Sequence, residues 1–128
     1  MRWDSIHDLV SFHERRQRAV GAGWAPPVDV FETADAYVVV VELAGLEPGD
    51  FDVQATDETL TVSGRRGGEV GDVRFLHVER GYGEFSRAFA FPERIDVRAV
   101  SASFRNGLLT VTVPKRPSAG TLRIDVRP

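Results

Sequence analysis

From Val28 onward the sequence alternates apolar and polar residues in short runs, and Gly, Pro, Asn or Asp interrupts these runs every few residues. Alternation with a period of two places one set of side chains on each face of a strand, so each run predicts a half-buried β-strand. The turn residues between the runs fit tight connections between antiparallel neighbours. Residues 1–24 are the only segment with a helical period. The pattern from Val28 onward therefore predicts an all-β fold, an antiparallel β-sandwich.

Two of these runs carry additional information. In residues 36–43, AYVVVVEL, Val38 and Val40 make the second face apolar too, which predicts a central strand covered at least partly on both sides. Asn106-Gly107 predicts a type I′ hairpin turn, because both positions tolerate a positive φ. We also interpret Gly81–Gly83 as a hairpin turn, since it lacks the third glycine and the helix of a phosphate loop. The predicted strands are residues 36–43, 51–56, 59–65, 84–92, 100–105 and 108–113.

Residues 1–24 have a different period. Trp3, Ile6, Leu9 and Val10 recur at helical spacing before the basic stretch HERRQR, which predicts a short amphipathic helical arm. A helix this short is only marginally stable alone in water, and we therefore expect its apolar stripe to pack on another surface. We expect three regions: an N-terminal arm at residues 1–24, a β-sandwich domain at 25–115 and an extended C-terminal tail at 116–128.

The C-terminal stretch TLRIDVRP alternates again, with Leu122, Ile124 and Val126 on one face. This is the pattern of a half-buried strand, yet it follows the breaker-rich stretch PKRPSAG and has no obvious surface to cover it. Two interpretations stay open. The segment is either a last strand of its own sheet or a strand intended for another copy of the chain.

Composition excludes several classes of function. A chain of 128 residues can bury roughly two-thirds of its unfolded surface, so one domain needs no disulfide or metal. The absence of cysteine removes thiol catalysis and thiolate metal sites. A net charge of -3 with scattered arginines argues against nucleic acid, and no stretch approaches the roughly 20 apolar residues that span a membrane. Asp4 and Asp8 argue against a secretory signal, so we expect a cytoplasmic protein.

Motifs of catalysis and cofactor binding are also missing. There is no Walker-type loop, since Lys115 follows a proline, and no G-x-S-x-G elbow. His7, His13 and His77 offer no pair at metal-ligand spacing. We therefore expect no catalytic, cofactor-binding or metal-ligating residues, no cofactor, and a protein that is not an enzyme.

Three ordered motifs between about Pro26 and Lys115 resemble the α-crystallin domain of small heat shock proteins of the bacterial and plant type. They are PPVDVFETADAYVVVVELAGL, VERGYGEFSRAFAFP and VSASFRNGLLTVTVPK. The last contains that family's A-x-x-x-N-G-L-L signature, from Ala102 to Leu109. The resemblance implies an immunoglobulin-like β-sandwich and an ATP-independent chaperone that holds partly unfolded proteins and prevents their aggregation under stress.

The resemblance also implies a homo-oligomer built from dimers that exchange a strand. That strand would lie in the long loop RRGGEVGDVRFLHVERG, in which Gly67, Gly68 and Gly71 supply a hinge. The alternative is a hairpin arm folded on its own domain. Arg87 would lie at the dimer interface, the alternative being a plain surface arginine. The exchanged strand would be residues 73–78, with Val73, Phe75, Leu76 and Val78.

The tail matches the family's I-x-I-like motif, which docks between the strands at residues 51–56 and 100–105 of another subunit. Ile124 and Val126 match it and Leu122 continues the register, so which pair docks stays open. The accepting groove would include Val53, Val100 and Ala102. We hypothesise that heat or subunit exchange uncovers the apolar residues of the N-terminal arm, which then bind unfolded clients, although the arm could equally serve oligomer packing. The expected client-binding residues are Trp3, Ile6, Leu9, Val10 and Phe12.

Two other classes of protein compete with this interpretation. One is a monomeric co-chaperone-like β-sandwich that docks on a single partner, against which the tail motif and the long loop argue. The other is a small β-sandwich enzyme or carbohydrate binder. That class requires a converging polar site, and the sequence shows none.

Overall fold

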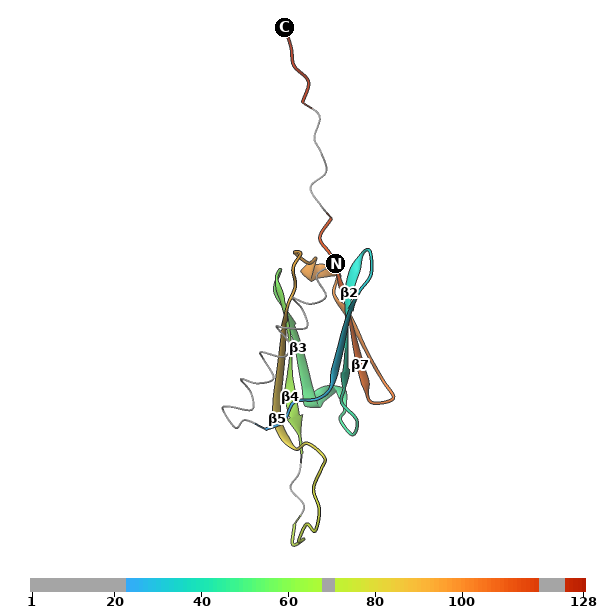
Figure 1. Cartoon of the computed structure of the whole chain (residues 1–128), viewed down its shortest axis with the longest axis vertical. Helices are drawn as coiled ribbons and strands as arrows, with labels where there is room; N and C mark the ends of the chain where they lie inside the picture. The colour runs from blue at the N-terminus through green and yellow to red at the C-terminus, as the bar shows by residue number, and fades with distance from the viewer. Residues whose placement is uncertain (1–22, 68–70, 118–123) are drawn as a thin grey trace.

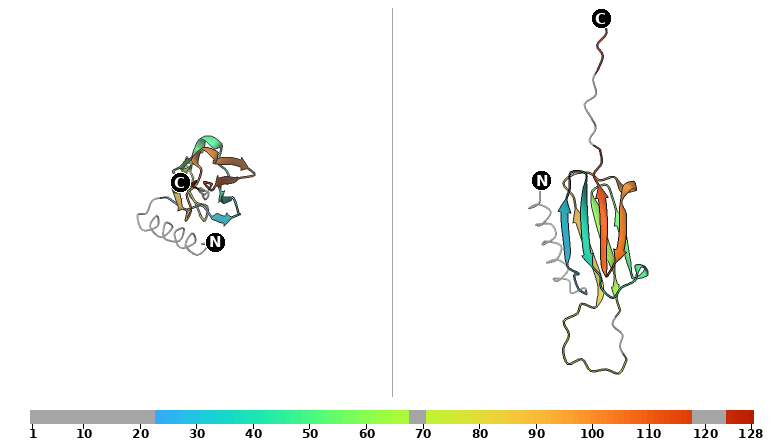
Figure 2. Two further views of the ribbon diagram at one scale, coloured as in Figure 1. Left: turned by 90° about the horizontal axis from the view of Figure 1, so that it is seen from above. Right: turned by 90° about the vertical axis from the view of Figure 1, so that its right-hand side faces the viewer.

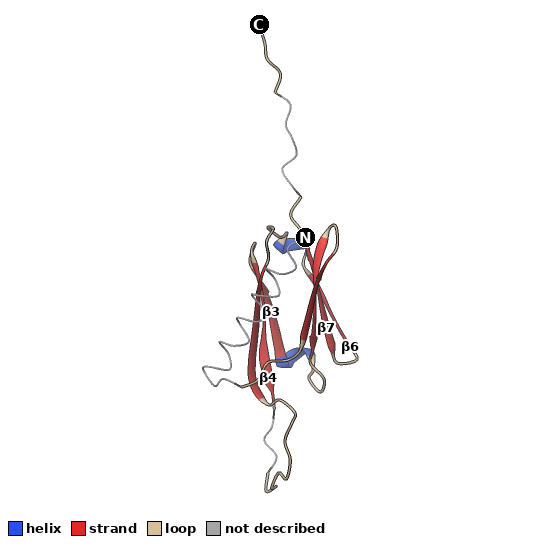
Figure 3. Cartoon of the chain, in the orientation of Figure 1, coloured by secondary structure: helices blue, strands red, loops and turns tan. Residues whose placement is uncertain are grey.

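The computed structural model describes residues 23–67, 71–117 and 124–128. Two antiparallel sheets pack face to face as the layers of a sandwich (Figure 1), and single-turn 3₁₀ helices lie between strands (Figure 3). The four-stranded sheet has the order β1-β2-β7-β6 and the three-stranded sheet the order β3-β4-β5. The elements are β1 Val28–Glu32, β2 Ala36–Glu42, η1 Pro48–Asp50, β3 Phe51–Ala55, β4 Thr59–Arg66, β5 Gly83–Ala90, η2 Val97–Ala99, β6 Ser101–Arg105 and β7 Leu108–Pro114.

The predicted antiparallel β-sandwich is confirmed, and each predicted strand matches an observed strand to within two residues at either end. The predicted hairpin turn joins β6 to β7, where Asn106 has φ 54° and Gly107 has φ 76°. Both values lie in the left-handed region that a type I′ turn requires. The predicted helical arm lies outside the described residues, and the three regional boundaries stay predictions.

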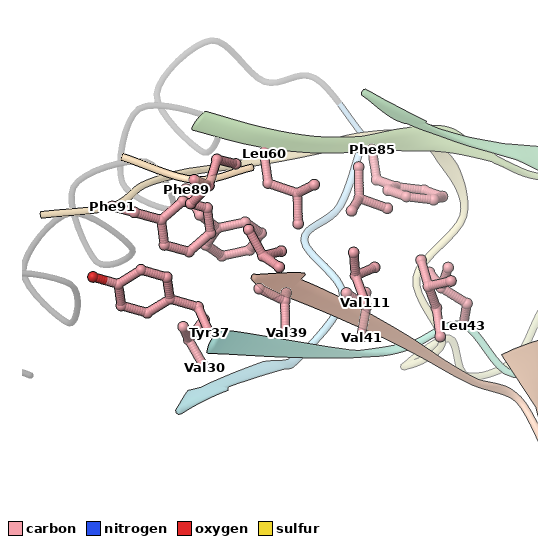
Figure 4. Close-up of a cluster of buried hydrophobic side chains, with 14 of the residues drawn as sticks. Val30, Tyr37, Val39, Val41, Leu43, Leu60, Phe85, Phe89, Phe91 and Val111 are labelled. Atoms are coloured by element: carbon pink, nitrogen blue, oxygen red, sulfur yellow. The ribbon is translucent and has the colours of Figure 1, made fainter. Parts of the chain in front are cut away.

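The core forms where the inward-facing positions of the two sheets meet. Val39 and Val41 of β2, Leu60 of β4 and Val111 of β7 are completely buried in this layer (Figure 4). At one end of the sandwich the ring of Tyr37 stacks on another aromatic ring, that of Phe91, with 4.7 Å between the ring centroids. Burial of each aliphatic side chain contributes roughly 1.5–3 kcal/mol, so these alternating positions supply the driving force for the fold.

Strand β2 is central, as its doubly apolar sequence predicts, because it pairs with β1 on one side and β7 on the other. Its outward-facing residues Val38 and Val40 are only half-buried. Their neighbours across the outer face include Phe31 and Thr110, so this face is covered in part rather than by a further layer.

The prediction of a tight hairpin turn at Gly81–Gly83 is wrong. Strands β4 and β5 pair from Thr59 opposite Ala90 to Arg66 opposite Gly83, and residues 67–82 lie between these last two partners. This loop extends beyond one end of the sandwich, whereas the C-terminal tail leaves at the other end (Figure 2). The chain returns to the sheet beneath Trp24, because Gly81 lies directly against the indole ring.

Replacing Leu60 with alanine should lower the free energy of unfolding by about 2–5 kcal/mol, because the side chain is completely buried between the sheets. Urea unfolding monitored by circular dichroism measures the difference. Leu108→Ala is the matched control, since Leu108 is 41% exposed and should cost less than about 1 kcal/mol. Equal losses for the two variants would contradict the assigned core.

Candidate functional site

Strands β3 and β6 are free edges of the two sheets, and they face each other across the sandwich. The rings of Phe51 on β3 and Phe104 on β6 meet edge to face, with centroids 5.0 Å apart. The partly buried apolar residues that line this side and pack on the core define what we call the β3/β6 edge: Phe51, Val53, Ala55, Val100 and Phe104.

Ala102 shows that the β3/β6 edge is incompletely covered. It pairs with Val111, whose side chain is completely buried, and directly opposed residues of antiparallel strands project to the same face. Ala102 therefore faces the interior of the sandwich, yet it is exposed to solvent. The sequence-predicted residues Val53 and Val100 are half-buried along the same edge. Because Ala102 faces inward yet is exposed, an apolar side chain from another segment would find partly buried neighbours beside it.

The tail leaves the sandwich from a fixed root at Lys115 and Arg116. The amide of Lys115 donates to the carbonyl of Asp35 at 2.9 Å, and the amide of Arg116 donates to the carbonyl of Arg94 at 2.9 Å. The ammonium of Lys115 lies 2.5 Å from a carboxylate oxygen of Glu32 and 3.7 Å from one of Glu93. The chain is therefore hydrogen-bonded to the sandwich as far as Arg116.

The Lys115–Glu32 pair closes one end of the core. The side chains of the two residues are only 14% and 10% exposed, and the ammonium lies 5.2 Å from the centre of the Tyr37 ring. The hydrogen bond to Glu32 raises the pKa of Lys115, because it favours the charged form. Burial also raises the pKa of the nearby Tyr37 hydroxyl, because it disfavours the charged form.

The described end of the tail carries exposed apolar side chains. Ile124 is 70% exposed and Val126 is 90% exposed, while Leu122 lies outside the described residues. Residues 124–128 add no strand to either sheet, and they lie away from the sandwich (Figure 1). In the part of the tail that the structure describes, the last alternating segment is therefore not a strand of its own sheet.

The loop between β4 and β5 presents a second set of exposed apolar side chains. Residues 73–78 have no regular secondary structure within this single chain, so the exchanged strand stays a prediction. His77, which we expected in a strand, lies in the loop and contacts Glu79 at 3.3 Å. The hinge residues Gly67 and Gly71 have open space around them. The exposed fractions are 55% for Val73, 53% for Phe75, 86% for Leu76 and 54% for Val78.

Arg87 lies inside the single chain rather than on its surface. It projects inward from β5 between Phe85 and Phe89, and its side chain is 1% exposed. A terminal nitrogen of its guanidinium donates a hydrogen bond to the carbonyl oxygen of Pro26. The alternative of a plain surface arginine is therefore wrong, while a role for Arg87 at a dimer interface stays a prediction.

Some of the remaining sequence predictions concern residues that the structure does not describe, and others can be compared with the described residues. The expected client-binding residues, together with His7 and His13, lie outside the described residues. Over the ranges 23–67, 71–117 and 124–128, no three acidic or histidine side chains gather as metal ligands would. Within these ranges no helix is long and apolar enough to cross a membrane.

Sequence reasoning missed the two aromatic residues that define the β3/β6 edge, Phe51 and Phe104. Both occupy inward positions of predicted strands, so alternation alone could have placed them inside. It also missed Trp24 and Arg66, which form a cation–π contact of 4.1 Å at the root of the long loop. Proximity of these two residues depends on the bonding of Trp24 to the start of β5, which lies opposite Arg66, and no local pattern reveals so long-range a contact.

Solved structures share this antiparallel sandwich, which is the α-crystallin type. A small heat-shock protein from Xylella fastidiosa superposes with a TM-score of 0.73 at 35% identity, covering 84% of this chain and 100% of that one. Heat shock protein 16.0 from Schizosaccharomyces pombe has a TM-score of 0.66 at 36% identity, covering 80% of this chain and 98% of that one.

Residues 29–127 match the Hsp20/alpha crystallin family. Spore protein SP21 from Stigmatella aurantiaca is 38% identical over 98% of this chain and 75% of its own length. A 17.0 kDa class II heat shock protein from Zea mays is 48% identical over 73% of this chain, which spans 62% of that relative. The chain belongs to the Hsp20/alpha crystallin family, as its motifs predict, and this membership supports a chaperone role.

Replacing Lys115 with methionine should lower the free energy of unfolding by about 3 kcal/mol, because Glu32 would keep a nearly buried charge without its cation. The folded-state pKa of Lys115 is raised, so its stabilisation is fully present below the ordinary value of 10.5 and is lost as pH rises through the raised pKa. Urea unfolding at neutral pH and above the raised pKa measures both effects.

The matched control for Lys115→Met is Arg94→Met. Arg94 contacts Asp57 at 3.0 Å, but the side chains are 60% and 42% exposed, so its loss should cost less than about 1 kcal/mol. A difference between wild type and Lys115→Met that persists unchanged at high pH would contradict the ion-pair account.

Proposed function

We propose that this protein is an ATP-independent holdase, which binds partly unfolded proteins and keeps them from aggregating, and that it is not an enzyme. The observation that carries the proposal is the incomplete β3/β6 edge, where Ala102 faces inward yet is exposed. Exposed apolar edges are hazards for an isolated domain unless another chain covers them. An assembly that covers and uncovers such edges can present apolar surface when clients unfold.

Tail docking is the first element of the proposed assembly. Ile124 and Val126 of one copy would lie against the β3/β6 edge of another, near Val53, Val100 and Ala102. Support comes from the exposure of both tail side chains and from the hydrogen bonds that fix the tail root at Lys115 and Arg116. Leu122 lies in the same alternating register and belongs to the proposed motif.

The strength of one tail contact can be bounded. Burial of two or three aliphatic side chains yields roughly 1.5–3 kcal/mol each. Association costs an estimated 4–15 kcal/mol or so, so one tail on one edge binds weakly. When dimers present several tails together, their combined binding is much stronger than that of one tail, while each single contact can still dissociate and re-form. Such an assembly loosens reversibly, which is what a holdase requires.

Strand exchange within a dimer is the second element. Residues 73–78 would pair with a free sheet edge of a second copy, where Val73, Phe75, Leu76 and Val78 would gain neighbours. Their exposure in the single chain supports this proposal, since contiguous exposed apolar surface is a mark of interaction sites. We place Arg87 near the resulting interface, where its planar guanidinium suits a carboxylate partner.

Client binding is assigned to the N-terminal arm, through Trp3, Ile6, Leu9, Val10 and Phe12. The support is the helical spacing of these residues, which predicts an apolar stripe along the arm. We also propose that the protein is cytoplasmic. The heat-shock names of the relatives fit a role under stress. The Xylella fastidiosa structure is described as revealing a distinct high order structure, which fits a homo-oligomer.

The combined variant Ile124→Ser and Val126→Ser should reduce the native mass from a larger assembly to dimers, because the tail would lose the side chains that dock. Light scattering measures the mass, and suppression of the aggregation of a heated client protein in ATP-free buffer measures the function. Wild type should keep the client soluble.

The matched control is Asp125→Ser with Arg127→Ser, which alters the same tail in the opposite register and should leave the mass unchanged. An unchanged mass for the Ile124 and Val126 variant would contradict tail docking. Failure of wild type to suppress aggregation without ATP would contradict the holdase proposal. A wild-type mass of one chain would favour the monomeric co-chaperone-like module.

A further inference from the structure

Trp24 is held firmly at the point where the sandwich begins. Its backbone amide donates to the carbonyl of Glu84 at 3.2 Å, and its indole nitrogen donates to the carbonyl of Gly83 at 3.1 Å. The indole ring also packs edge to face on Phe85, with centroids 5.5 Å apart. These contacts fix Trp24 to the start of β5, the strand to which the long loop returns.

Arg66 connects the other end of the loop to the same tryptophan. It is the last residue of β4 and lies opposite Gly83, and its guanidinium lies 4.1 Å from the centre of the Trp24 ring. The two terminal nitrogens of the guanidinium donate to the carbonyl of Gly81 at 3.1 Å and to that of Ala44 at 2.8 Å. One planar side chain therefore joins both ends of loop 67–82 to the connection that follows β2.

Glycine is required where the chain passes beneath the indole ring. A Cβ atom at Gly81 would overlap the ring of Trp24, so an alanine there must displace the ring. Gly23, which precedes the tryptophan, has φ 54° and lies against the carbonyl oxygen of Glu84. By contrast, a Cβ atom at Gly49 in η1 would meet nothing within 4 Å.

We propose that Trp24, Arg66 and Gly81 form a clasp that fixes the direction of loop 67–82 and joins it to the root of the N-terminal arm. The inference rests on the strand exchange proposed above and assigns these three as positioning residues for it. A loop held in its binding direction loses less conformational freedom when it meets its partner, so the clasp favours the dimer without contacting the second copy.

The test compares the same substitution at two glycines of the full-length chain. Gly81→Ala should release the clasp, whereas Gly49→Ala, in η1, should leave it intact. The readout is the rate at which isotope-labelled and unlabelled chains form mixed dimers, followed by native mass spectrometry. We expect a roughly tenfold faster rate for Gly81→Ala, the factor that corresponds to about 1.4 kcal/mol, and less than about a twofold change for Gly49→Ala.

Two further readouts separate a positioning role from general instability. In a Trp3→Phe background Trp24 is the only tryptophan, so its emission should shift to the red in Gly81→Ala and not in Gly49→Ala. Arg66→Lys keeps the charge but loses the planar fork, so it should also speed mixing, while Arg65→Lys at the exposed neighbouring position should not. This arginine pair decides the question if Gly81→Ala does not fold.

Each outcome has one meaning. Faster mixing in Gly81→Ala or Arg66→Lys, with unchanged controls, supports the clasp. Equal rates for the clasp variants and their controls, in a dimeric wild type, overturn the clasp and leave the proposed function standing. A wild type that is a single chain in solution overturns the proposed strand exchange, and the clasp inference fails with it.

Discussion

The two sheets bury their facing side chains completely at the centre of the sandwich, but they leave a side open where β3 and β6 end the sheets. Each of these strands pairs on one side only, so its outer backbone groups and part of its inward face have no partner among the described residues. Phe51 and Phe104 close the opening in part, while Ala102 stays exposed between the sheets. The apolar tail and loop become useful because this domain has edges that a second chain can complete.

A cationic side chain anchors the root of the tail, the root of the long loop and the segment at Pro26. Lys115 holds the tail root through Glu32, Arg66 holds the loop root against Trp24, and Arg87 donates to the carbonyl of Pro26 near the arm. Hydrogen bonds from charged donors are stronger than neutral ones, and most of these groups are shielded from solvent. The segments that we propose to exchange between copies thus depart from fixed positions, which reduces the conformational entropy lost on assembly.

The strands, the central position of β2 and the Asn106-Gly107 turn could be predicted from the sequence, because periodicity and turn chemistry are local. The β3/β6 edge could be predicted only in part. Val53 and Val100 lie there, but the meeting of Phe51 with Phe104 depends on how two separate sheets face each other. The turn predicted at Gly81–Gly83 is absent. Two glycines around an aromatic residue resemble a turn, whereas Gly81 is small to accommodate Trp24. The exchanged strand stays a prediction, since its partner edge belongs to another copy.

The absence of cysteine allows the central claim to be tested by a single cross-link between copies. Chains with Ala102→Cys are mixed with chains carrying Ile124→Cys under mild oxidation, and the products are separated by mass. If one copy's tail completes another's β3/β6 edge, a disulfide should join the two kinds of chain efficiently, and Asp125→Cys in place of Ile124→Cys should react poorly. The absence of mixed products, or a double variant that closes the bond within one chain on dilution, would contradict the account.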